Sequence, residues 1–260
     1  MTVLSWNDLN SPQAGIAGPV RLTIGVFDGL HIGHRRLMEG VVHGSGGGIP
    51  LVITFRQSPA IVLAPGTFPG LILTYRQKLA RLGSLGIGAV VVIDFSREMS
   101  NLSGKAFIAL LMERLAIEKI AVGHDFRFGK GGNAGTDDLK EMLSATGTEV
   151  QVTEPVLWGG SIVSSSRIRK TIKDAEFSAA KAMLAAAYAL DLRGIPTQTL
   201  ERGAVRIAQS GLTQVLPKPG TYPVLCTGSA GEMPGEITVG EDALTIAAAD
   251  CNDIAMVFFQ

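Results

Sequence analysis

Residues 23–34 read Thr23-Ile24-Gly25-Val26-Phe27-Asp28-Gly29-Leu30-His31-Ile32-Gly33-His34, and the rest of the chain is organised around them. Apolar residues at alternate positions from Val20 to Val26 have the spacing of a buried β-strand. Phe27-Asp28-Gly29 interrupts that spacing, and a helix is predicted to begin near His31–His34 and to continue through Met38. We therefore predict a strand that leads through a glycine turn into a helix.

This predicted turn has the features of a phosphate site. Gly29 and Gly33 have no Cβ, so the backbone can approach a ligand closely. The first turn of the helix presents N–H groups and a partial positive charge. His31 and His34 are three residues apart, so they face the same way and can donate hydrogen bonds to phosphate oxygens. The structural alternative is a helix that begins with two histidines and binds nothing.

The composition describes a compact globular chain. Of its 260 residues, 46% are apolar and 18% are charged, which argues against disorder and allows one large or two modest domains. Lysine plus arginine and aspartate plus glutamate each total 23, so the formal net charge is zero. No bulk positive charge indicates a nucleic-acid partner, and phosphate binding must come from local clusters.

The cysteines and the N-terminal segment bear on compartment. Cys226 and Cys251 have no CxxC spacing, so we expect no structural zinc site and reduced, buried thiols, with one disulfide left open. Residues 1–18 lack a basic segment followed by an apolar core. No apolar run approaches the length of about 18–20 residues that a membrane span needs. We expect a cytoplasmic protein with no signal peptide and no membrane partner.

Apolar runs and amphipathic stretches alternate beyond the first helix. Strands are predicted over residues 51–55, 89–93, 120–122 and 149–153, and helices over residues 75–85, 106–115 and 137–143. Residues 1–19 are expected to be irregular or lightly structured, and residues 56–69 are expected to form a loop. Strands separated by helices pair in parallel, so we predict an α/β protein with a Rossmann-like, doubly wound parallel sheet. Ligands of such sheets bind at the carboxyl ends of the strands.

Two further segments carry chemistry. Residues 123–132 read Gly123-His124-Asp125-Phe126-Arg127-Phe128-Gly129-Lys130-Gly131-Gly132, a loop that can stack on a planar ring and meet a phosphate. Its alternative is a surface turn whose phenylalanines anchor it to the core. Residues 163–169 read Val163-Ser164-Ser165-Ser166-Arg167-Ile168-Arg169. This serine cluster can cap a helix, or its hydroxyls and arginines can cradle a triphosphate.

Together the three segments resemble one enzyme family. HxGH at residues 31–34 is the signature of nucleotidylyl transferases, and GxFDGxHxGH at residues 25–34 resembles the adenylyltransferase module of bacterial FAD synthetases. Residues 125–129 resemble the family's [D/N]FRFG loop. Residues 164–169 resemble its SSTxIR motif, with Ser166 in place of threonine. The resemblance covers about residues 22–190 and implies transfer of AMP from ATP to FMN, giving FAD and pyrophosphate.

The resemblance also implies roles for individual residues. The expected catalytic residues are Asp28, His31, His34 and Arg169. The expected ATP-binding residues are Gly25, Phe27, Gly29, Gly33, Ser164, Ser165, Ser166 and Arg167. The expected flavin-binding residues are Thr54, Phe55, Asp125, Phe126, Arg127 and Phe128. Mg²⁺ is expected to accompany ATP with few protein ligands, and none is assigned. The partners are small molecules, and a homo-oligomer is left open.

One departure from the family concerns the acceptor. The family has TFxPHP where this chain has Thr54-Phe55-Arg56-Gln57-Ser58-Pro59, so a Gln-Ser pair replaces Pro-His. This loop borders the flavin in the family, which makes FMN less secure than ATP as a substrate. Adenylyl or cytidylyl transfer to another phosphate acceptor is the nearest alternative. A non-catalytic flavin or nucleotide sensor is another, although both histidines and both motif arginines are retained.

The other departure concerns the C-terminal part. We expect residues 1–188 to form the adenylyltransferase domain and residues 189–260 a shortened, barrel-like β-rich domain that resembles riboflavin kinase. Short strands are predicted over residues 205–207, 222–225, 236–239, 243–246 and 255–259. The kinase marker GxPTAN is only echoed at residues 194–199, where Gln198-Thr199 replaces Ala-Asn. Residues 216–222 resemble the barrel's LPxxGxY stretch, but no later glutamate segment is found and the region is short. We therefore expect kinase activity to be lost, and a partner-binding or dimerising role is left open.

Overall fold

A computed structural model describes the chain except residues 11–15, 17, 45–46, 65, 230 and 250–252. The described residues divide into two compact units. One consists of residues 1–68 and 79–162, and the other of residues 69–78 and 163–260. The division falls inside helix α3 (Tyr75–Ser84) and after residue 162, so α7 and α8 belong with the C-terminal strands. The predicted functional boundary between residues 188 and 189 stays a prediction.

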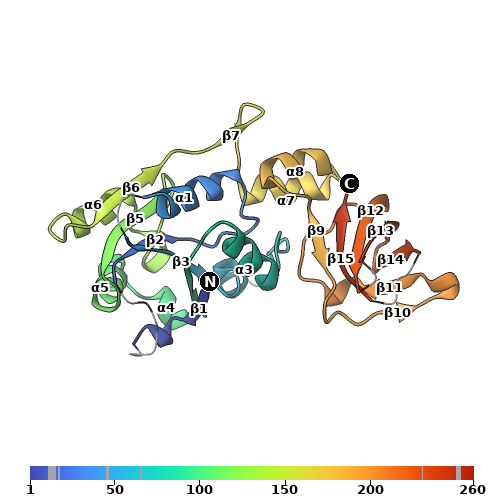
Figure 1. The fold of residues 1–260 in the computed structure, drawn as a ribbon, viewed down its shortest axis with the longest axis horizontal. Helices are drawn as coiled ribbons and strands as arrows, with labels where there is room; N and C mark the ends of the chain where they lie inside the picture. The colour runs from blue at the N-terminus through green and yellow to red at the C-terminus, as the bar shows by residue number, and fades with distance from the viewer. Residues whose placement is uncertain (11–15, 17, 45–46, 65, 230, 250–252) are drawn as a thin grey trace. The chain divides into compact units, whose positions relative to one another are not determined.

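The first unit is built on a parallel sheet of six strands in the order β1-β4-β3-β2-β5-β6 (Figure 1). The strands are β1 (Thr2–Ser5), β2 (Val20–Ile24), β3 (Ile49–Phe55), β4 (Ala89–Ile93), β5 (Ile117–Gly123) and β6 (Glu149–Thr153). Every neighbouring pair is parallel. All residues of β2 and β4 are buried, as expected for parallel strands covered on both faces.

Helices cover both faces of this sheet. They are α1 (Ile32–Val42), α2 (Pro59–Leu63), α3, α4 (Arg97–Ser100), α5 (Gly104–Arg114) and α6 (Thr136–Leu143). Buried residues of α5 and α6 form one core cluster with Leu22, Ile24, Leu51 and Ile53, and the buried residues of α1 lie outside that cluster. Figure 1 shows α1 and α5 on opposite sides of the sheet. The predicted Rossmann-like, doubly wound sheet is therefore confirmed.

The strand order places a switch point beside β2. From β2 the chain builds outward through β3 to β4, and then returns to lay β5 against the other edge of β2. Right-handed crossovers put the connecting helices on opposite faces on the two sides of such a reversal. Ligands of open α/β sheets bind beside the carboxyl ends of the strands at this point. The turn from β2 to α1 lies there.

Two predictions for the first unit are wrong. Residues 1–19 were expected to be irregular or at most lightly structured, but Thr2–Ser5 form β1, which pairs in parallel with β4 as a regular strand of the sheet, and Asn7–Asn10 form a 3-10 helix. Residues 11–15 and 17 lie outside the described part. Residues 56–69 were expected to be a loop, but they contain α2, which begins at Pro59. Proline is tolerated at the first position of a helix, where its missing N–H has no partner to lose.

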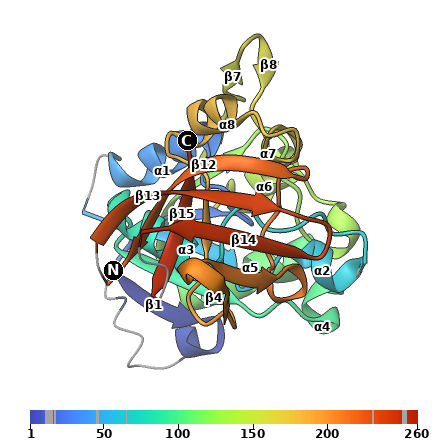
Figure 2. The same ribbon diagram turned by 90° about the vertical axis from the view of Figure 1, so that its right-hand side faces the viewer.

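The second unit combines two helices with a curled antiparallel sheet. Helices α7 (Ser165–Lys173) and α8 (Phe177–Leu184) precede seven strands in the order β10-β11-β14-β13-β12-β15-β9. Figure 2 shows β12, β13 and β14 side by side. The strands are β9 (Ala189–Asp191), β10 (Gln198–Thr199), β11 (Val205–Ala208), β12 (Gly220–Gly228), β13 (Gly231–Val239), β14 (Ala243–Ala248) and β15 (Ile254–Phe259). The predicted barrel-like, β-rich region is confirmed, and β9 and β10 are strands that the sequence did not indicate.

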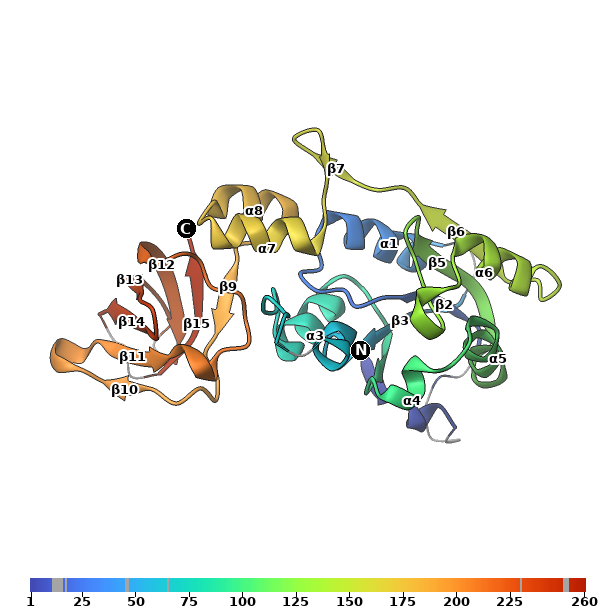
Figure 3. The ribbon, with the colours of Figure 1, turned by 180° about the vertical axis from the view of Figure 1, so that it is seen from behind.

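An aromatic cluster holds this second unit together. Phe177 of α8 stacks on Phe259 of β15 with ring centroids 4.4 Å apart, and Tyr188 stacks on the same ring at 5.7 Å. α7 and α8 lie side by side (Figure 3).

Cys226 is buried in β12, and Cys251 lies outside the described residues. In the part of the chain described, no helix is long and apolar enough to cross a membrane.

Candidate active site

The turn between β2 and α1 is held in an unusual backbone conformation. Phe27 and Leu30 have φ angles of 52° and 44°, in the left-handed region that side chains with a Cβ rarely adopt. Both side chains are buried in the core, which explains how the conformation is maintained. Gly25 leaves room for one of them, because a Cβ at this position would lie 2.8 Å from the Phe27 ring. The buried side chains of Phe27 and Leu30 therefore hold the backbone at Asp28 and Gly29 in one conformation.

The two motif histidines stack on each other at the start of α1. His31 is the N-cap residue, and its Nδ1 accepts a hydrogen bond from the backbone N–H of His34 at 3.3 Å. The two imidazole rings lie 3.6 Å apart and nearly parallel. The Phe27 ring meets the His34 ring edge to face at 5.2 Å. Sequence reasoning predicted the shared face, and the structure adds the stacking and the cap.

Burial determines the protonation state of His31, and the cap determines which ring nitrogen carries its proton. Burial lowers the pKa of His31 from 6.5 to about 4, an effect that the carboxylate of Asp125 partly opposes. The imidazole is therefore neutral at pH 7, and because its Nδ1 accepts a hydrogen bond, its proton resides on Nε2. His31 thus offers an N–H donor. The influence of Asp125 also shows that the loop after β5 lies near His31.

The lowered pKa of His31 predicts a pH dependence of stability. The unfolded chain, with a pKa of 6.5, binds more protons than the folded chain between pH 4 and pH 6.5. Folding stability is therefore fully present above pH 6.5 and falls as the pH drops towards 4. The lost free energy of unfolding should be up to about 3 kcal/mol, because each pKa unit corresponds to 1.36 kcal/mol.

Urea unfolding of the wild type and of His31→Asn between pH 4 and pH 7 tests this. Asparagine is a good N-cap and does not titrate, so the variant should show a flatter stability curve across this range. His43→Asn is the matched control, because His43 lies exposed at the other end of α1. Equal curves for the wild type and His31→Asn would contradict the assignment.

The end of β3 supports the turn. Thr54 is fully buried, and its hydroxyl donates to the carbonyl of Val26 at 3.1 Å. The N–H of Gly25 donates to the carbonyl of Ile53 at 3.1 Å. Phe55 is half-buried and meets Phe95 edge to face at 5.6 Å. Thr54 therefore positions the turn through its hydroxyl, a role that the resemblance did not supply.

The loop after β5 contains both anchoring and exposed side chains. Phe128 is buried against Phe107 of α5, and Phe126 stacks on Phe128 with centroids 5.3 Å apart. Reciprocal backbone hydrogen bonds between Phe128 and Ala134 close the loop. Asp125 and Arg127 are exposed. Phe128 therefore has the core-anchoring role of the structural alternative, and Phe126 packs partly against the same core. A ligand-binding role for Asp125, Phe126 and Arg127 stays a prediction.

The serine–arginine segment begins α7 in the second unit. The hydroxyl of Ser164 accepts from the N–H of Arg167 at 3.2 Å, so the serine is the N-cap of the helix. Ser165 and Ser166 follow in the first turn. Nε of Arg169 donates to the carbonyl of Gly70 at 2.8 Å. The structure shows the cap, and a triphosphate cradle at this helix start stays a prediction. That it meets the same nucleotide as the histidines of the first unit stays a prediction.

The sequence did not indicate one cationic side chain that lies beside the turn. Arg81 of α3 is half-buried and lies 3.4 Å from the carbonyl of Gly29, to which it donates. Burial and the neighbouring Arg35 lower the pKa of Arg81 to about 10. A single arginine on an amphipathic helix has no sequence signature.

In the described residues, no group of three His, Cys, Asp or Glu side chains is placed to hold a metal ion.

Comparisons with known proteins agree with this arrangement. Residues 15–167 match the sequence profile of the family described as FAD synthetase. The bifunctional riboflavin kinase/FMN adenylyltransferase of Escherichia coli K12 is 30% identical over 236 residues, which cover 88% of this chain and 74% of that protein. The protein of the same name from Pseudomonas fluorescens is 31% identical over 186 residues, covering 69% of this chain and 58% of that protein.

A solved structure shares the fold along the whole chain. It is described as a macrolide-efflux protein from Streptococcus pneumoniae, and it superposes with a TM-score of 0.81 and 22% identity over 100% of this chain and 98% of its own. At that identity the likeness concerns fold alone. The profile match covers more than half of the chain and contains the β2–α1 turn, β3 and the loop after β5. The chain therefore belongs to the FAD synthetase family.

Proposed function

We propose that this chain transfers AMP from ATP to FMN and produces FAD and pyrophosphate. The observation that carries the proposal is the stacked histidine pair at the start of α1, in which buried, neutral His31 offers its Nε2 hydrogen beside the N–H groups of the helix. This arrangement favours a bound polyphosphate through hydrogen bonds and the helix dipole. Membership of the FAD synthetase family supports FMN as the acceptor.

The reaction is an in-line displacement at the α-phosphorus of ATP. An oxygen of the FMN phosphate forms a new bond to that phosphorus, and the bond to the oxygen bridging to the β-phosphate breaks. Pyrophosphate leaves with the electron pair. No covalent enzyme intermediate is required, so catalysis comes from positioning and from stabilising charge. His31 and His34 donate to phosphate oxygens on which charge develops.

The remaining residues have roles in binding. Ser164, Ser165, Ser166, Arg167 and Arg169 are proposed to hold the β- and γ-phosphates at the start of α7. When bound together with ATP, Mg²⁺ would supply positive charge to the phosphate oxygens. Asp28 is the nearly buried carboxylate of the turn and can approach it. On the acceptor side, Asp125, Phe126 and Arg127 are exposed or half-buried, and Phe55 closes the end of β3. The cytoplasmic location stays a prediction.

The decisive experiment is pyrophosphate release from ATP by the purified chain with different acceptors. FMN should give pyrophosphate and FAD, and riboflavin should give neither FAD nor pyrophosphate. Release with nicotinate mononucleotide or phosphopantetheine but not FMN would assign another acceptor, and release with CTP in place of ATP would assign cytidylyl transfer. Tight binding of FAD with no pyrophosphate from any acceptor would identify a sensor instead.

We also propose that the β-rich region has lost riboflavin kinase activity. Gln198 and Thr199 stand where the kinase marker has alanine and asparagine, and in the structure they form β10, the edge strand paired with β11. A glutamine-threonine pair in a short edge strand lacks the asparagine that the marker supplies. Riboflavin and ATP incubated with the chain should give no FMN by liquid chromatography, and FMN accumulating in proportion to enzyme would contradict this.

A further inference from the structure

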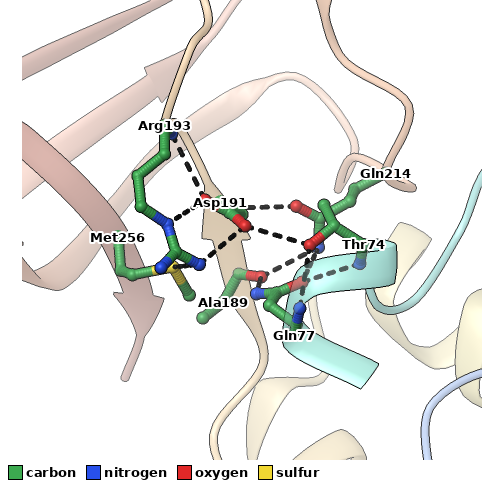
Figure 4. Close-up of polar contacts among 7 residues, drawn as sticks. All are labelled: Thr74, Gln77, Ala189, Asp191, Arg193, Gln214 and Met256. Carbon is green, nitrogen blue, oxygen red and sulfur yellow. Dashed lines mark hydrogen bonds and ion pairs between the residues drawn. The ribbon is translucent and has the colours of Figure 1, made fainter. Parts of the chain in front are cut away.

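Polar side chains of the second unit, most of them buried or half-buried, form a hydrogen-bonded network (Figure 4), which consists of Thr74, Gln77, Asp191, Arg193 and Gln214. Gln214 is the hub of this network because its amide binds other members of the network and the neighbouring backbone. Its Nε2 donates to the carbonyl of Ala189 at 2.9 Å and to that of Ile72 at 3.1 Å, and its Oε1 accepts from the N–H of Asp191 at 2.8 Å. Gln77 adds a bond to the carbonyl of Ala189 at 2.9 Å. Buried amides are retained where every polar atom is satisfied, and this hub is.

Asp191 is the charged member of the network. Its two carboxylate oxygens accept from Nε and a terminal nitrogen of Arg193 at 2.7 and 2.8 Å, and from the hydroxyl of Thr74 at 3.0 Å. Burial alone would raise the pKa of Asp191, but the hydrogen bonds from Arg193 and Thr74 hold it below its usual value. The carboxylate is therefore ionised. Its position is determined by Arg193, which is two residues away in the sequence, and by Thr74, which is far away in the sequence.

The network joins a short segment to the β-rich region. Residues 69–78, which precede most of α3, contribute Thr74 and Gln77. The same segment pairs with the stretch before β12, because the N–H of Leu71 donates to the carbonyl of Thr213 and the N–H of Val215 to that of Leu71. Gly70 has a φ of 100°, and a Cβ there would lie 2.8 Å from the backbone nitrogen of Val215. The segment is docked too closely for any larger residue.

This docking bears on the proposed triphosphate cradle. The carbonyl of Gly70 accepts the hydrogen bond from Nε of Arg169, which lies in the SSTxIR-like segment of α7. A bond at Nε fixes the plane in which the two terminal nitrogens of a guanidinium lie. The orientation of Arg169 therefore depends on where the Gly70 carbonyl is held, and that depends on Leu71, Thr74 and Gln77.

We propose that Gln214 and Asp191 form a positioning network for Arg169, so that the β-rich region takes part in binding ATP. The inference rests on the proposed function, since it takes Arg169 as a ligand of the ATP phosphates. Gln214 and Asp191 touch no phosphate themselves. They hold residues 69–78, and through the Gly70 carbonyl they hold the guanidinium in the plane that a phosphate group requires. Supporting residues of this kind determine how well a binding group is preorganised.

The test is a double-mutant cycle on the full chain. Gln214→Leu should raise the KM for ATP by about tenfold while the KM for FMN stays within about twofold, as expected for residues coupled in one network. In an Arg169→Ala background, the same substitution should produce no further rise. Gln209→Leu is the matched control, because Gln209 also donates to a backbone carbonyl in this unit, that of Gly240, outside the network.

A second variant keeps the test valid if Gln214→Leu does not fold. Thr74→Val keeps the shape of a half-buried side chain and removes the hydroxyl that donates to Asp191 and accepts from the backbone N–H of Gln77, so the variant should raise the KM for ATP in the same direction. Dissociation constants for a non-hydrolysable ATP analogue, measured on all variants with matching thermal unfolding, give a readout that needs no turnover.

The outcomes separate the two proposals. Additive effects of Gln214→Leu and Arg169→Ala, or an unchanged affinity for the ATP analogue in both Gln214→Leu and Thr74→Val, would overturn the positioning role. A wild-type chain that binds the analogue but releases no pyrophosphate with any acceptor would contradict the proposed function and leave the cycle measurable by binding. Loss of stability with unchanged affinity would make the network structural only, which also overturns the inference.

Discussion

His34→Ala should lower the turnover number for FAD formation by at least about tenfold, the effect expected when developing charge loses one preorganised donor. His34 lies in the first turn of α1, and its ring is held between the parallel face of His31 and the edge of Phe27. This packing restricts the ring before substrate arrives. The proposed hydrogen-bond donor is therefore held in place before ATP binds.

The substitution is informative because it removes the ring and little else. The hydrogen bond that caps α1 uses the backbone N–H of His34 and the side chain of His31, so alanine preserves it. An interaction made only in the transition state lowers kcat and kcat/KM together and leaves the KM for ATP nearly unchanged. We expect that signature in steady-state kinetics with pyrophosphate detection.

His43→Ala is the matched control for this experiment. It removes the same kind of side chain from the opposite end of the same helix, where the residue is exposed at the C-cap. Its turnover should equal that of the wild type. An unchanged kcat in His34→Ala, with His43→Ala also unchanged, would remove the histidine pair from the chemistry.

Much of the first unit was predictable because its signals are local. Strands such as Ala89–Ile93 are continuous apolar runs, and Ser103 caps α5 by accepting from the N–H of Ala106, only three residues later. The β2–α1 turn carries its own glycines and histidines. Each of these features is decided by residues within a few positions of one another.

The features that the sequence did not reveal depend on distant residues. β1 is a strand because Thr2–Ser5 find an open edge of β4, about ninety positions later. The docking of residues 69–78 needs Gln214 and Asp191, which lie more than a hundred positions along the chain. The candidate site also depends on distant residues, because Phe128 is an anchoring side chain only through its contact with Phe107 of α5. The sequence of the loop alone does not show which of its side chains are buried and which are exposed.

That anchored loop supplies the other large expected effect. Gly129→Ala should destabilise the chain by about 3–5 kcal/mol, because two costs add. Gly129 has a φ of 75° and a ψ of −178°, a conformation that is essentially confined to glycine. A Cβ at this position would also lie 2.5 Å from the backbone nitrogen of Gly104, at the start of α5, and backbone atoms cannot move aside as a flexible side chain can.

Gly131→Ala in the same loop isolates the steric part of that cost. Gly131 also has a positive φ, 65°, but with a ψ of 12° it lies in the ordinary left-handed region, and nothing lies within 4 Å of a Cβ built there. It should cost only about 1 kcal/mol. Urea midpoints of the two variants, compared with the wild type, measure the difference. Equal midpoints would show that the loop does not pack on α5, and Asp125, Phe126 and Arg127 would then lose the rigid support that an acceptor site requires.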